Sequence, residues 1–379
     1  MLNHTAAGES PYLIAAVTGR SLAASASRGG PGAVVLDCFG DCDTRGLAAA
    51  CHAIGCVGAI RFDARALLAA ASAAAPPRGS AGLVYGGGFE ARTTLLARLA
   101  RGRTLYGNPP EIVEAVKDPR RFFPLLDRLR VRHPAVRFRR PNRAAGWLVK
   151  ETGGAGGAHV RPADQRQPPA GAYFQRFEEG QSLSALFLAD GRRARVLGFS
   201  RQWTAPARRA RPFLYGGAAG GAHLPPGMES DVCAVLERLV NATGLVGLNG
   251  LDFLQRGSEW LALEVNPRPT ATVDLYDPDY PCGLFDWHLR ACRGELPERA
   301  ARPRAARAHG IVYLSGPARM SDELRFPGWC RDVPMPGTRL RPGDPVCTVH
   351  AAAPGPHRAI ALVRRRQAAM QQALLGRAA

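Results

Sequence analysis

The chain has 379 residues, 46% of them hydrophobic, and a formal net charge of +19. This length exceeds what one hydrophobic core usually supports, so we expect two or three domains. The charge does not by itself indicate nucleic acid as a partner, because the arginines are scattered along the chain and RNA-binding signatures are absent.

Residues 1–105 alternate short apolar runs with alanine-rich stretches, which is typical of a small parallel α/β domain of Rossmann-like character. Strands are predicted over 11–17, 32–40 and 81–89, and a helix over 65–75. The glycines of this segment do not spell GxGxxG, so the sequence gives no reason to expect dinucleotide binding here.

Residues 106–297 are predicted as a second domain in which helices and strands are mixed. The predicted helices are 108–131, divided at Pro119, then 230–244, ending at Gly244, and 285–297. The predicted strands are 147–150, 172–177, 184–189, 194–200, 247–255 and 259–266. We expect the last two strands to form an antiparallel hairpin that turns at residues 256–258.

Residues 298–379 are predicted as a small β-rich domain, whose strands follow an Arg-, Ala- and Pro-rich linker at 301–309. The predicted strands are 310–316, 345–351 and 358–363. Residues 297–379 contain no lysine, and biotin and lipoate are attached to lysine, so this segment cannot carry either group.

Cysteine usage and hydropathy favour a cytoplasmic protein. The nine cysteines form no CxxC pair, which predicts free thiols in a reducing compartment. No apolar run approaches the roughly 20 residues that cross a bilayer, and no signal-peptide pattern is present. We therefore expect no membrane partner.

Lysine is almost absent, although 50 residues are lysine or arginine: the lysines are Lys117 and Lys150 alone. In such a chain, lysine is expected where a compact ammonium group is needed and a planar guanidinium would not serve. Lys150 ends an apolar run and directly precedes a loop with four glycines, Gly153, Gly154, Gly156 and Gly157. A lysine that enters a glycine-rich loop from a strand is a phosphate-binding arrangement.

Two acidic residues and an asparagine interrupt the apolar runs of the predicted hairpin. In that hairpin Asp252 can lie near Glu264, and Glu264 and Asn266 project from the same face of their strand. Two carboxylates and an amide oxygen are suitable ligands for Mg²⁺. Arg268, after Pro267, would lie at the rim of this site, where it can hold a phosphate or carboxylate group.

In this order, these motifs resemble those of the ATP-grasp superfamily over roughly residues 106–297. The likeness is greatest to predicted ATP-dependent carboligases distantly related to biotin carboxylase, some of which accompany cofactors of the tetrahydromethanopterin and methanofuran type. The resemblance implies an ATP-grasp fold, α/β and α+β in class, with the nucleotide between two subdomains. It also implies an N-terminal pre-ATP-grasp domain. Because the C-terminal segment has no lysine for a carrier group, we expect it to support the active site.

The resemblance also implies roles for single residues. Lys117 and Lys150 would contact the α- and β-phosphates, and the loop of Gly153, Gly154, Gly156 and Gly157 would close over the triphosphate. The segment of Gln175, Arg176, Phe177 and Glu178 would read the adenine edge. Many members hold the ribose with a glutamate where this chain has Ser182. Asp252, Glu264 and Asn266 would bind Mg²⁺, and Arg268 would lie near the γ-phosphate.

The implied activity is an ATP-dependent carboxylate–amine ligase that uses ATP and two Mg²⁺ ions, which Mn²⁺ can replace. A carboxylate would become an acylphosphate, and an amine would displace the phosphate; glutamate and tyramine are one substrate pair that the family suggests, in one-carbon cofactor biosynthesis. The partners are then small molecules, with a homo-oligomer left open. The alternatives are a biotin-carboxylase-like enzyme that uses bicarbonate, and a basic nucleic-acid-binding protein without catalysis.

Residues 200–221 are the longest stretch of the central segment without a clear pattern. Three of its arginines, Arg208, Arg209 and Arg211, could bind an anionic substrate, and Trp203 and Tyr215 could pack on a ring. A solvated surface loop is the equally weighted alternative. His159, just after the glycine loop, could contact a phosphate, although a loop histidine without a role is favoured.

Overall fold

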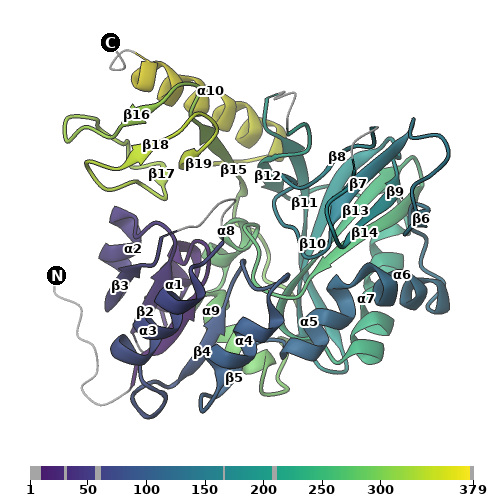
Figure 1. Cartoon of the computed structure of the whole chain (residues 1–379), viewed down its shortest axis with the longest axis horizontal. Helices are drawn as coiled ribbons and strands as arrows, with labels where there is room; N and C mark the ends of the chain where they lie inside the picture. Colours follow the sequence, from purple (N-terminus) through teal and green to yellow (C-terminus); the bar gives the residue numbers. More distant parts are fainter. Residues whose placement is uncertain (1–9, 30–31, 56–60, 165–166, 207–210, 376–379) are drawn as a thin grey trace.

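The computed structural model describes residues 10–29, 32–55, 61–164, 167–206 and 211–375. Figure 1 shows an N-terminal α/β segment in purple and blue, a central segment with long teal and green strands, and a C-terminal segment in yellow-green. Within the described residues, no helix combines the length and apolar character that a membrane span requires.

The N-terminal segment is a parallel α/β unit, as predicted. Its five strands run parallel in the order β3-β2-β1-β4-β5. The elements are β1 (Tyr12–Ala15), α1 (Arg20–Ala26), β2 (Ala33–Asp37), α2 (Cys42–Leu47), β3 (Ala50–Ala53), α3 (Ala64–Ala74), η1 (Pro77–Gly79), β4 (Gly82–Tyr85), α4 (Thr93–Ala100) and β5 (Leu105–Tyr106). The strands β1, β2 and β4 are buried along their whole length, which explains their uninterrupted apolar sequence.

The central segment begins with two helices and a small antiparallel sheet. These elements are α5 (Pro110–Lys117), α6 (Pro119–Arg128), β6 (Val136–Arg137), β7 (Trp147–Glu151), β8 (Arg161–Pro162) and β9 (Ala172–Arg176). The sheet has the order β6-β9-β7-β8. Pro119 starts α6 and Asp118 caps it by accepting the N–H of Arg120, so the predicted break leaves Lys117 as the last residue of α5.

A second, eight-stranded sheet follows in the order β14-β13-β10-β11-β12-β15-β19-β17. Its central-segment members and the helices between them are β10 (Gln181–Asp190), β11 (Ala194–Thr204), β12 (Tyr215–Gly220), α7 (Met228–Thr243), β13 (Val246–Arg256), β14 (Glu259–Asn266), α8 (Val273–Tyr276), η2 (Asp277–Asp279) and α9 (Gly283–Ala291). The predicted strands, the helix that ends before Gly244, and the hairpin of β13 and β14 are all present.

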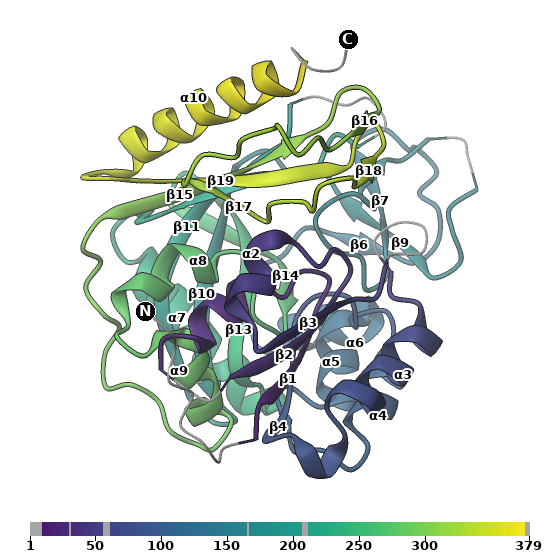
Figure 2. The ribbon, with the colours of Figure 1, turned by 90° about the vertical axis from the view of Figure 1, so that its left-hand side faces the viewer.

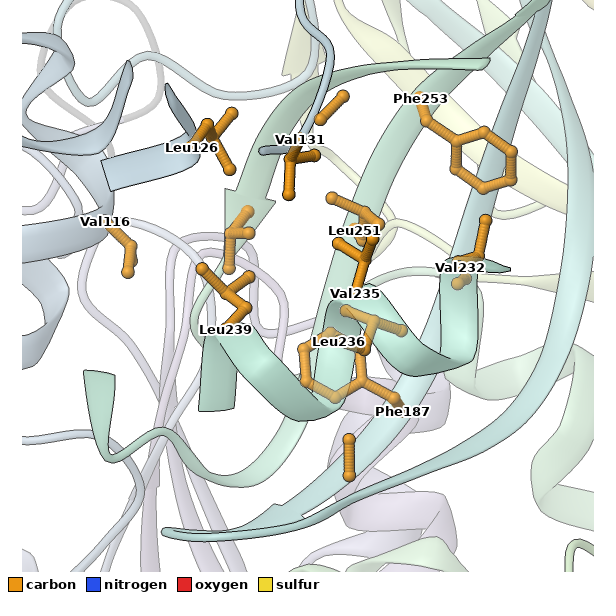
Figure 3. Close-up of a cluster of buried hydrophobic side chains, with 14 of the residues drawn as sticks. Val116, Leu126, Val131, Phe187, Val232, Val235, Leu236, Leu239, Leu251 and Phe253 are labelled. Carbon is orange, nitrogen blue, oxygen red and sulfur yellow. The ribbon is translucent and has the colours of Figure 1, made fainter. Parts of the chain in front are cut away.

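One face of this sheet carries the largest hydrophobic core, shown in Figure 3. Phe187 of β10 and Phe253 of β13 pack with residues of α7 such as Leu236, and Val116 of α5 and Leu126 of α6 complete the cluster. Because β14 is the edge strand of the sheet, this packing brings the end of α5 beside it. The polar residues that alternate with these core residues lie on the opposite face of the sheet.

The C-terminal segment adds strands to the same sheet and covers it with a helix. Its elements are β15 (Ala306–Tyr313), β16 (Ala318–Arg319), β17 (Cys330–Arg331), β18 (Arg339–Leu340), β19 (Pro345–Ala353) and α10 (Pro356–Leu375). Figure 2 shows α10 lying along β19 and β15. After β17, the backbone N–H groups of Asp332 and Val333 donate to Asp43 of α2, which ties this segment to the N-terminal one.

Two predictions from the sequence are wrong in detail. Residues 358–363, predicted as a strand, belong to α10, because the buried residues Ala359, Val363, Met370 and Leu374 recur at helical spacing beyond the short apolar run. Cys38 is disulfide-bonded and not a free thiol. An odd cysteine count without CxxC could not exclude this, since pairing depends on distance in the fold.

Candidate functional site

Asp252 and Glu264 lie directly opposite each other in the hairpin of β13 and β14. The register shifts between Asp252 and Phe253, where Phe253 pairs with Ala262, so Leu263 is an extra residue in β14. Both Phe253 and Ala262 are fully buried in the core. Without this bulge, strict alternation from Ala262 would direct Glu264 into the core. The bulge therefore turns Glu264 to the face of Asp252.

Asn266 and Lys117 complete this polar group. The side-chain amide of Asn266 donates to Oδ2 of Asp252 at 2.8 Å, and Lys117 Nζ lies 3.4 Å from Oδ1 of Asn266. Lys117 Nζ also donates to Oε2 of Glu264 at 3.0 Å. The other carboxylate oxygen of Asp252 accepts from Gln202 of β11 at 3.0 Å. The structure thus brings four of the predicted residues together and adds Gln202, which the sequence reading did not single out.

The two carboxylates have opposite pKa shifts. Burial, and then repulsion from Glu264, raise the pKa of Asp252 to about 6. Although burial alone would raise it, the ammonium groups of Lys117 and Lys150 lower the pKa of Glu264 to about 2. The positively charged groups near Asp252 therefore do not fully balance the negative charge of the two carboxylates. This imbalance favours the binding of a cation.

Lys150 reaches the same region from the small sheet. It is 7% exposed, pairs across the sheet with Tyr173, and donates from Nζ to Oε1 of Gln175 at 3.3 Å. Although burial acts in the opposite direction, Tyr173 and Glu264 raise the pKa of Lys150, so the ammonium form is retained. Lys150 and Lys117 thus both act electrostatically on Glu264.

The glycine loop between β7 and β8 is packed against the start of β12. Gly153, Gly156 and Gly157 have φ values of 69°, 66° and 71°, which side-chain-bearing residues rarely adopt. A Cβ atom at Gly157 would lie 1.8 Å from the carbonyl oxygen of Phe213, and the N–H of Tyr215 donates to the carbonyl of Gly156 at 2.9 Å. The loop therefore lies close against the start of β12.

His159 lies closer to the polar group than the sequence reading favoured. It lines a pocket together with Lys117, Gly154 and Glu264. Its Nδ1 atom is buried without a hydrogen-bond partner within the described residues, and burial lowers its pKa. A Cβ atom at Gly154 would be 2.2 Å from the imidazole ring, so this glycine makes room for His159. The pattern Gly-x-x-Gly-x-His could have signalled this contact.

The segment predicted to read the adenine edge begins on β9. Gln175 is 3% exposed, and its Nε2 atom has no hydrogen-bond partner in the described chain. Arg176 and Phe177 are exposed, whereas Glu178 forms an ion pair of 2.9 Å with Arg256. Ser182 lies in β10 opposite Leu254. Only Gln175 of these residues hydrogen-bonds to a lysine of the site.

Arg268 is held by a residue of the N-terminal segment. Its Nε atom donates to the carboxylate of Glu90, and the side chains of Arg268 and Glu90 are 12% and 4% exposed. Although burial alone would raise it, Arg268 and Lys117 lower the pKa of Glu90. The sequence reading missed Glu90, because nothing local relates it to a residue 178 positions away.

Residues 200–204 and 215–220 of the stretch 200–221 are strand, in contrast to the expectation of an unpatterned stretch. Trp203 belongs to β11 and packs on the C-terminal core. The hydroxyl of Tyr215 lies 2.8 Å from Nε2 of His309 in β15. Arg211 is exposed, while Arg208 and Arg209 lie outside the described residues.

The donor atoms around Asp252 fit a hard divalent cation. Among the described residues, no cluster of three or more His, Cys, Asp or Glu side chains could hold a metal ion. The proposed set has two carboxylates, and Asn266 supplies its third oxygen. Oxygen donors of this kind, together with the raised pKa of Asp252, suit Mg²⁺ and do not suit a soft metal.

Residues 116–272 match the sequence profile of the ATP-grasp_3 family, described as an ATP-grasp domain. The chain contains an ATP-grasp domain. The matched segment of this ATP-grasp domain runs from the end of α5 to the residue before α8. It contains both lysines, the glycine loop, the hairpin carboxylates and Arg268, so all the predicted site residues lie within it.

A curated relative of this chain is the formate-dependent phosphoribosylglycinamide formyltransferase of Photobacterium profundum. It is 34% identical over 109 residues, which are 28% of this chain and 26% of that protein. The matched segment thus spans only about a quarter of the relative's length.

Solved structures resemble nearly the whole chain. Biotin carboxylase from Campylobacter jejuni superposes with a TM-score of 0.70 and 14% identity, covering 92% of this chain and 89% of that one. An L-amino acid ligase from Bacillus licheniformis gives a TM-score of 0.70 and 15% identity, covering 94% and 97%. At these identities the likeness establishes the ATP-grasp fold alone, including the flanking N- and C-terminal segments.

Proposed function

We propose that the protein is an ATP-dependent ligase that joins a carboxylate to an amine through an acylphosphate and releases ADP and phosphate. The observation that carries this proposal is the convergence of Lys117, Glu264, Asp252 and Asn266 within hydrogen-bond distances, inside the ATP-grasp domain. Phosphoryl transfer needs alignment and charge neutralisation more than covalent help from the protein. This group of charged side chains suits that need.

In the proposed mechanism the cationic side chains hold the phosphates. Lys117 and Lys150 neutralise the α- and β-phosphates, and Arg268 neutralises the γ-phosphate. A carboxylate oxygen of the substrate attacks the γ-phosphorus, the bond from that phosphorus to the bridging oxygen breaks, and ADP leaves with that oxygen. The glycine loop supplies backbone N–H groups from Gly153 to Gly157 and excludes water when it closes. The amine then attacks the acyl carbon, the bond from that carbon to the phosphate oxygen breaks, and the amine loses a proton.

Asp252, Glu264 and Asn266 would hold the Mg²⁺ ions, which when bound neutralise phosphate charge and lower the barrier to transfer. The chain's own part is to keep Glu264 ionised and the carboxylate of Asp252 aligned. Lys117 keeps Glu264 ionised, as the low pKa of Glu264 indicates. Gln202 and Asn266 orient the carboxylate of Asp252 by one hydrogen bond to each oxygen. Mn²⁺ is expected to replace Mg²⁺, because it accepts the same oxygen ligands.

For the substrates, we propose glutamate and tyramine, or a related amine of one-carbon cofactor biosynthesis. The likeness to predicted carboligases of that metabolism motivates this pair. The similar fold of an L-amino acid ligase supports the broader class of amino-acid substrates.

The test is ADP release by the purified protein against a panel of carboxylate and amine pairs, with bicarbonate as a separate arm. Release that requires both an acid and an amine supports the ligase. Turnover with bicarbonate and no amine would favour a biotin-carboxylase-like enzyme that uses a separate carrier. No ATP use with any pair, together with salt-dependent nucleic-acid binding, would favour the non-catalytic alternative. Glu264→Gln serves as the control for contaminating ATPases.

A further inference from the structure

The loop that follows β4, residues 86–91, contacts the ATP-grasp domain at two places. Glu90 forms the buried ion pair with Arg268. The next residue, Ala91, approaches the glycine loop so closely that a Cβ atom at Gly153 would lie 2.7 Å from its backbone nitrogen. The N-terminal segment therefore touches both the loop and the arginine that are proposed to hold the triphosphate.

This N-terminal loop is rigidly anchored. Phe89 is fully buried, with its ring centroid 5.2 Å from that of Phe62 and 5.7 Å from that of Tyr85. The N–H of Gly88 donates to the Oε2 atom of Glu90 at 2.8 Å, which fixes the carboxylate. Because its neighbour is locked in the N-terminal core, Glu90 has little freedom to follow a moving arginine.

The backbone around Arg268 is anchored as well. The carbonyl of Pro267 accepts from the hydroxyl of Tyr85 at 3.1 Å and from the amide of Asn108 at 2.9 Å. In the guanidinium group, Nε is taken by Glu90 and Nη1 by the carbonyl of Pro269 at 3.1 Å. Within the described residues, no hydrogen bond occupies Nη2. The Nη2 group of Arg268 thus stays available as a donor, while Nε and Nη1 are held in place by their hydrogen bonds.

We propose that Glu90 is a positioning residue for phosphoryl transfer: it fixes the guanidinium group of Arg268 so that Nη2 is presented to the transferring phosphate. This inference rests on the function proposed above. A charged arginine that is preorganised needs no reorientation when charge develops in the transition state. This role predicts that replacing Glu90 weakens contacts with the γ-phosphate. It predicts little change in the binding of the part of the nucleotide that ADP shares with ATP.

The test compares Glu90→Gln and Glu90→Asp with the wild type, using calorimetric binding of ADP and of a non-hydrolysable ATP analogue as well as turnover. In Glu90→Gln we expect kcat to fall by about 10- to 100-fold. Its affinity for the ATP analogue should fall about tenfold, while its affinity for ADP stays within about threefold. Glu90→Asp keeps the negative charge, so its kcat and its affinity for the ATP analogue should both be higher than those of Glu90→Gln.

A matched control is Asp277→Asn. It breaks the ion pair of Arg28 with Asp277, which also bridges the N-terminal and central segments but does not contact Arg268. The inference fails, and Glu90 is only structural, if Glu90→Gln and Asp277→Asn lower the melting temperature and the activity in parallel. It also fails if Glu90→Gln lowers the affinities for ADP and for the ATP analogue equally. A wild type that binds neither nucleotide would instead refute the proposed function. If Glu90→Gln does not fold, Glu90→Asp is used in its place. The inference then requires that Glu90→Asp lower the affinity for the ATP analogue more than the affinity for ADP.

Discussion

The Nζ atom of Lys117 lies 3.0 Å from Oε2 of Glu264, although the two residues are 147 positions apart in the chain. Lys117 ends α5, and Glu264 follows the bulge in the edge strand β14. The side chain of Lys117 is only 4% exposed, so the carboxylate of Glu264 faces an ammonium group that is largely removed from water. Removing one member of such a buried pair leaves an uncompensated charge, which is strongly destabilising. The contact thus links the hydrophobic core of α5 to the polar face of the sheet.

Replacing Lys150 by arginine should abolish nucleotide turnover although the charge is retained. Lys150 is buried between Tyr173 and Gln175, and a planar guanidinium group cannot place one compact donor at the position of Nζ. We expect kcat/KM for ATP to fall by at least about 100-fold. The control is Arg137→Lys, an exposed position on β6 of the same sheet. Near-normal activity of Lys150→Arg would refute the argument from lysine scarcity.

Glu264→Gln should raise the requirement for Mg²⁺. The substitution keeps the shape of the side chain and removes a charge that is present at neutral pH, since the pKa of Glu264 lies at about 2. The Mg²⁺ concentration for half-maximal activity should rise at least about tenfold. Glu259→Gln, exposed at the far end of β14, is the matched control. An unchanged metal requirement would remove Glu264 from the proposed ligands.

The fold was largely predictable where local sequence decides the structure. The hairpin turn near Gly257, the helix end at Gly244 and the break at Pro119 each depend on a few neighbouring residues, and all three are present. Residues 358–363 show the limit, because a short apolar run fits a strand and a helix equally well. The extended amphipathic pattern of the following residues decides for helix.

The site was predictable only in part, because its contacts join distant segments. Asp252 and Glu264 are related by a hairpin, so their proximity follows from the sequence. The ion pair of Glu90 with Arg268 and the hydrogen bond of Gln202 with Asp252 depend on how whole segments pack. No periodicity and no local motif in the sequence indicates either contact. The roles proposed for the predicted residues stay predictions until variants of them are assayed.

Gly157→Ala should disturb the glycine loop more than Gly156→Ala. Both residues have a positive φ, so an added methyl group strains either backbone by roughly 1–2 kcal/mol. At Gly157, however, a Cβ atom would be 1.8 Å from the carbonyl oxygen of Phe213, whereas at Gly156 nothing lies within 4 Å. The first substitution must therefore also move the loop away from β12.

The measurement is KM for ATP together with the melting temperature of each variant. We expect KM to rise about tenfold or more in Gly157→Ala and clearly less in Gly156→Ala, because only the former displaces the proposed phosphate-binding backbone. Melting temperatures should stay close to each other, since the loop contributes little to the core. Equal KM values would show that the contact with Phe213 has no part in nucleotide binding.

The buried His288 should make the protein less stable in mild acid. Its Nδ1 atom accepts the N–H of Leu248 at 2.9 Å, and Nε2 lies 3.1 Å from the carbonyl of Tyr106, so the ring is held in its neutral form. Burial lowers the pKa of His288 from 6.5 to about 4. Between these values the unfolded chain binds a proton that the folded chain does not. Stability should therefore fall as the pH falls, by about 1.4 kcal/mol per pH unit for this residue.

Urea unfolding at a series of pH values through this range measures the effect, and His288→Gln isolates it. The variant loses the ionisable group, so its free energy of unfolding should depend less steeply on pH than that of the wild type, by a total of about 3 kcal/mol over the range. Its stability at neutral pH will also be lower, and for this reason the slopes, not the absolute values, are compared. His223→Gln removes an exposed histidine and should leave the slope close to that of the wild type. Equal slopes for His288→Gln and the wild type would show that His288 is accessible to protons in the folded protein.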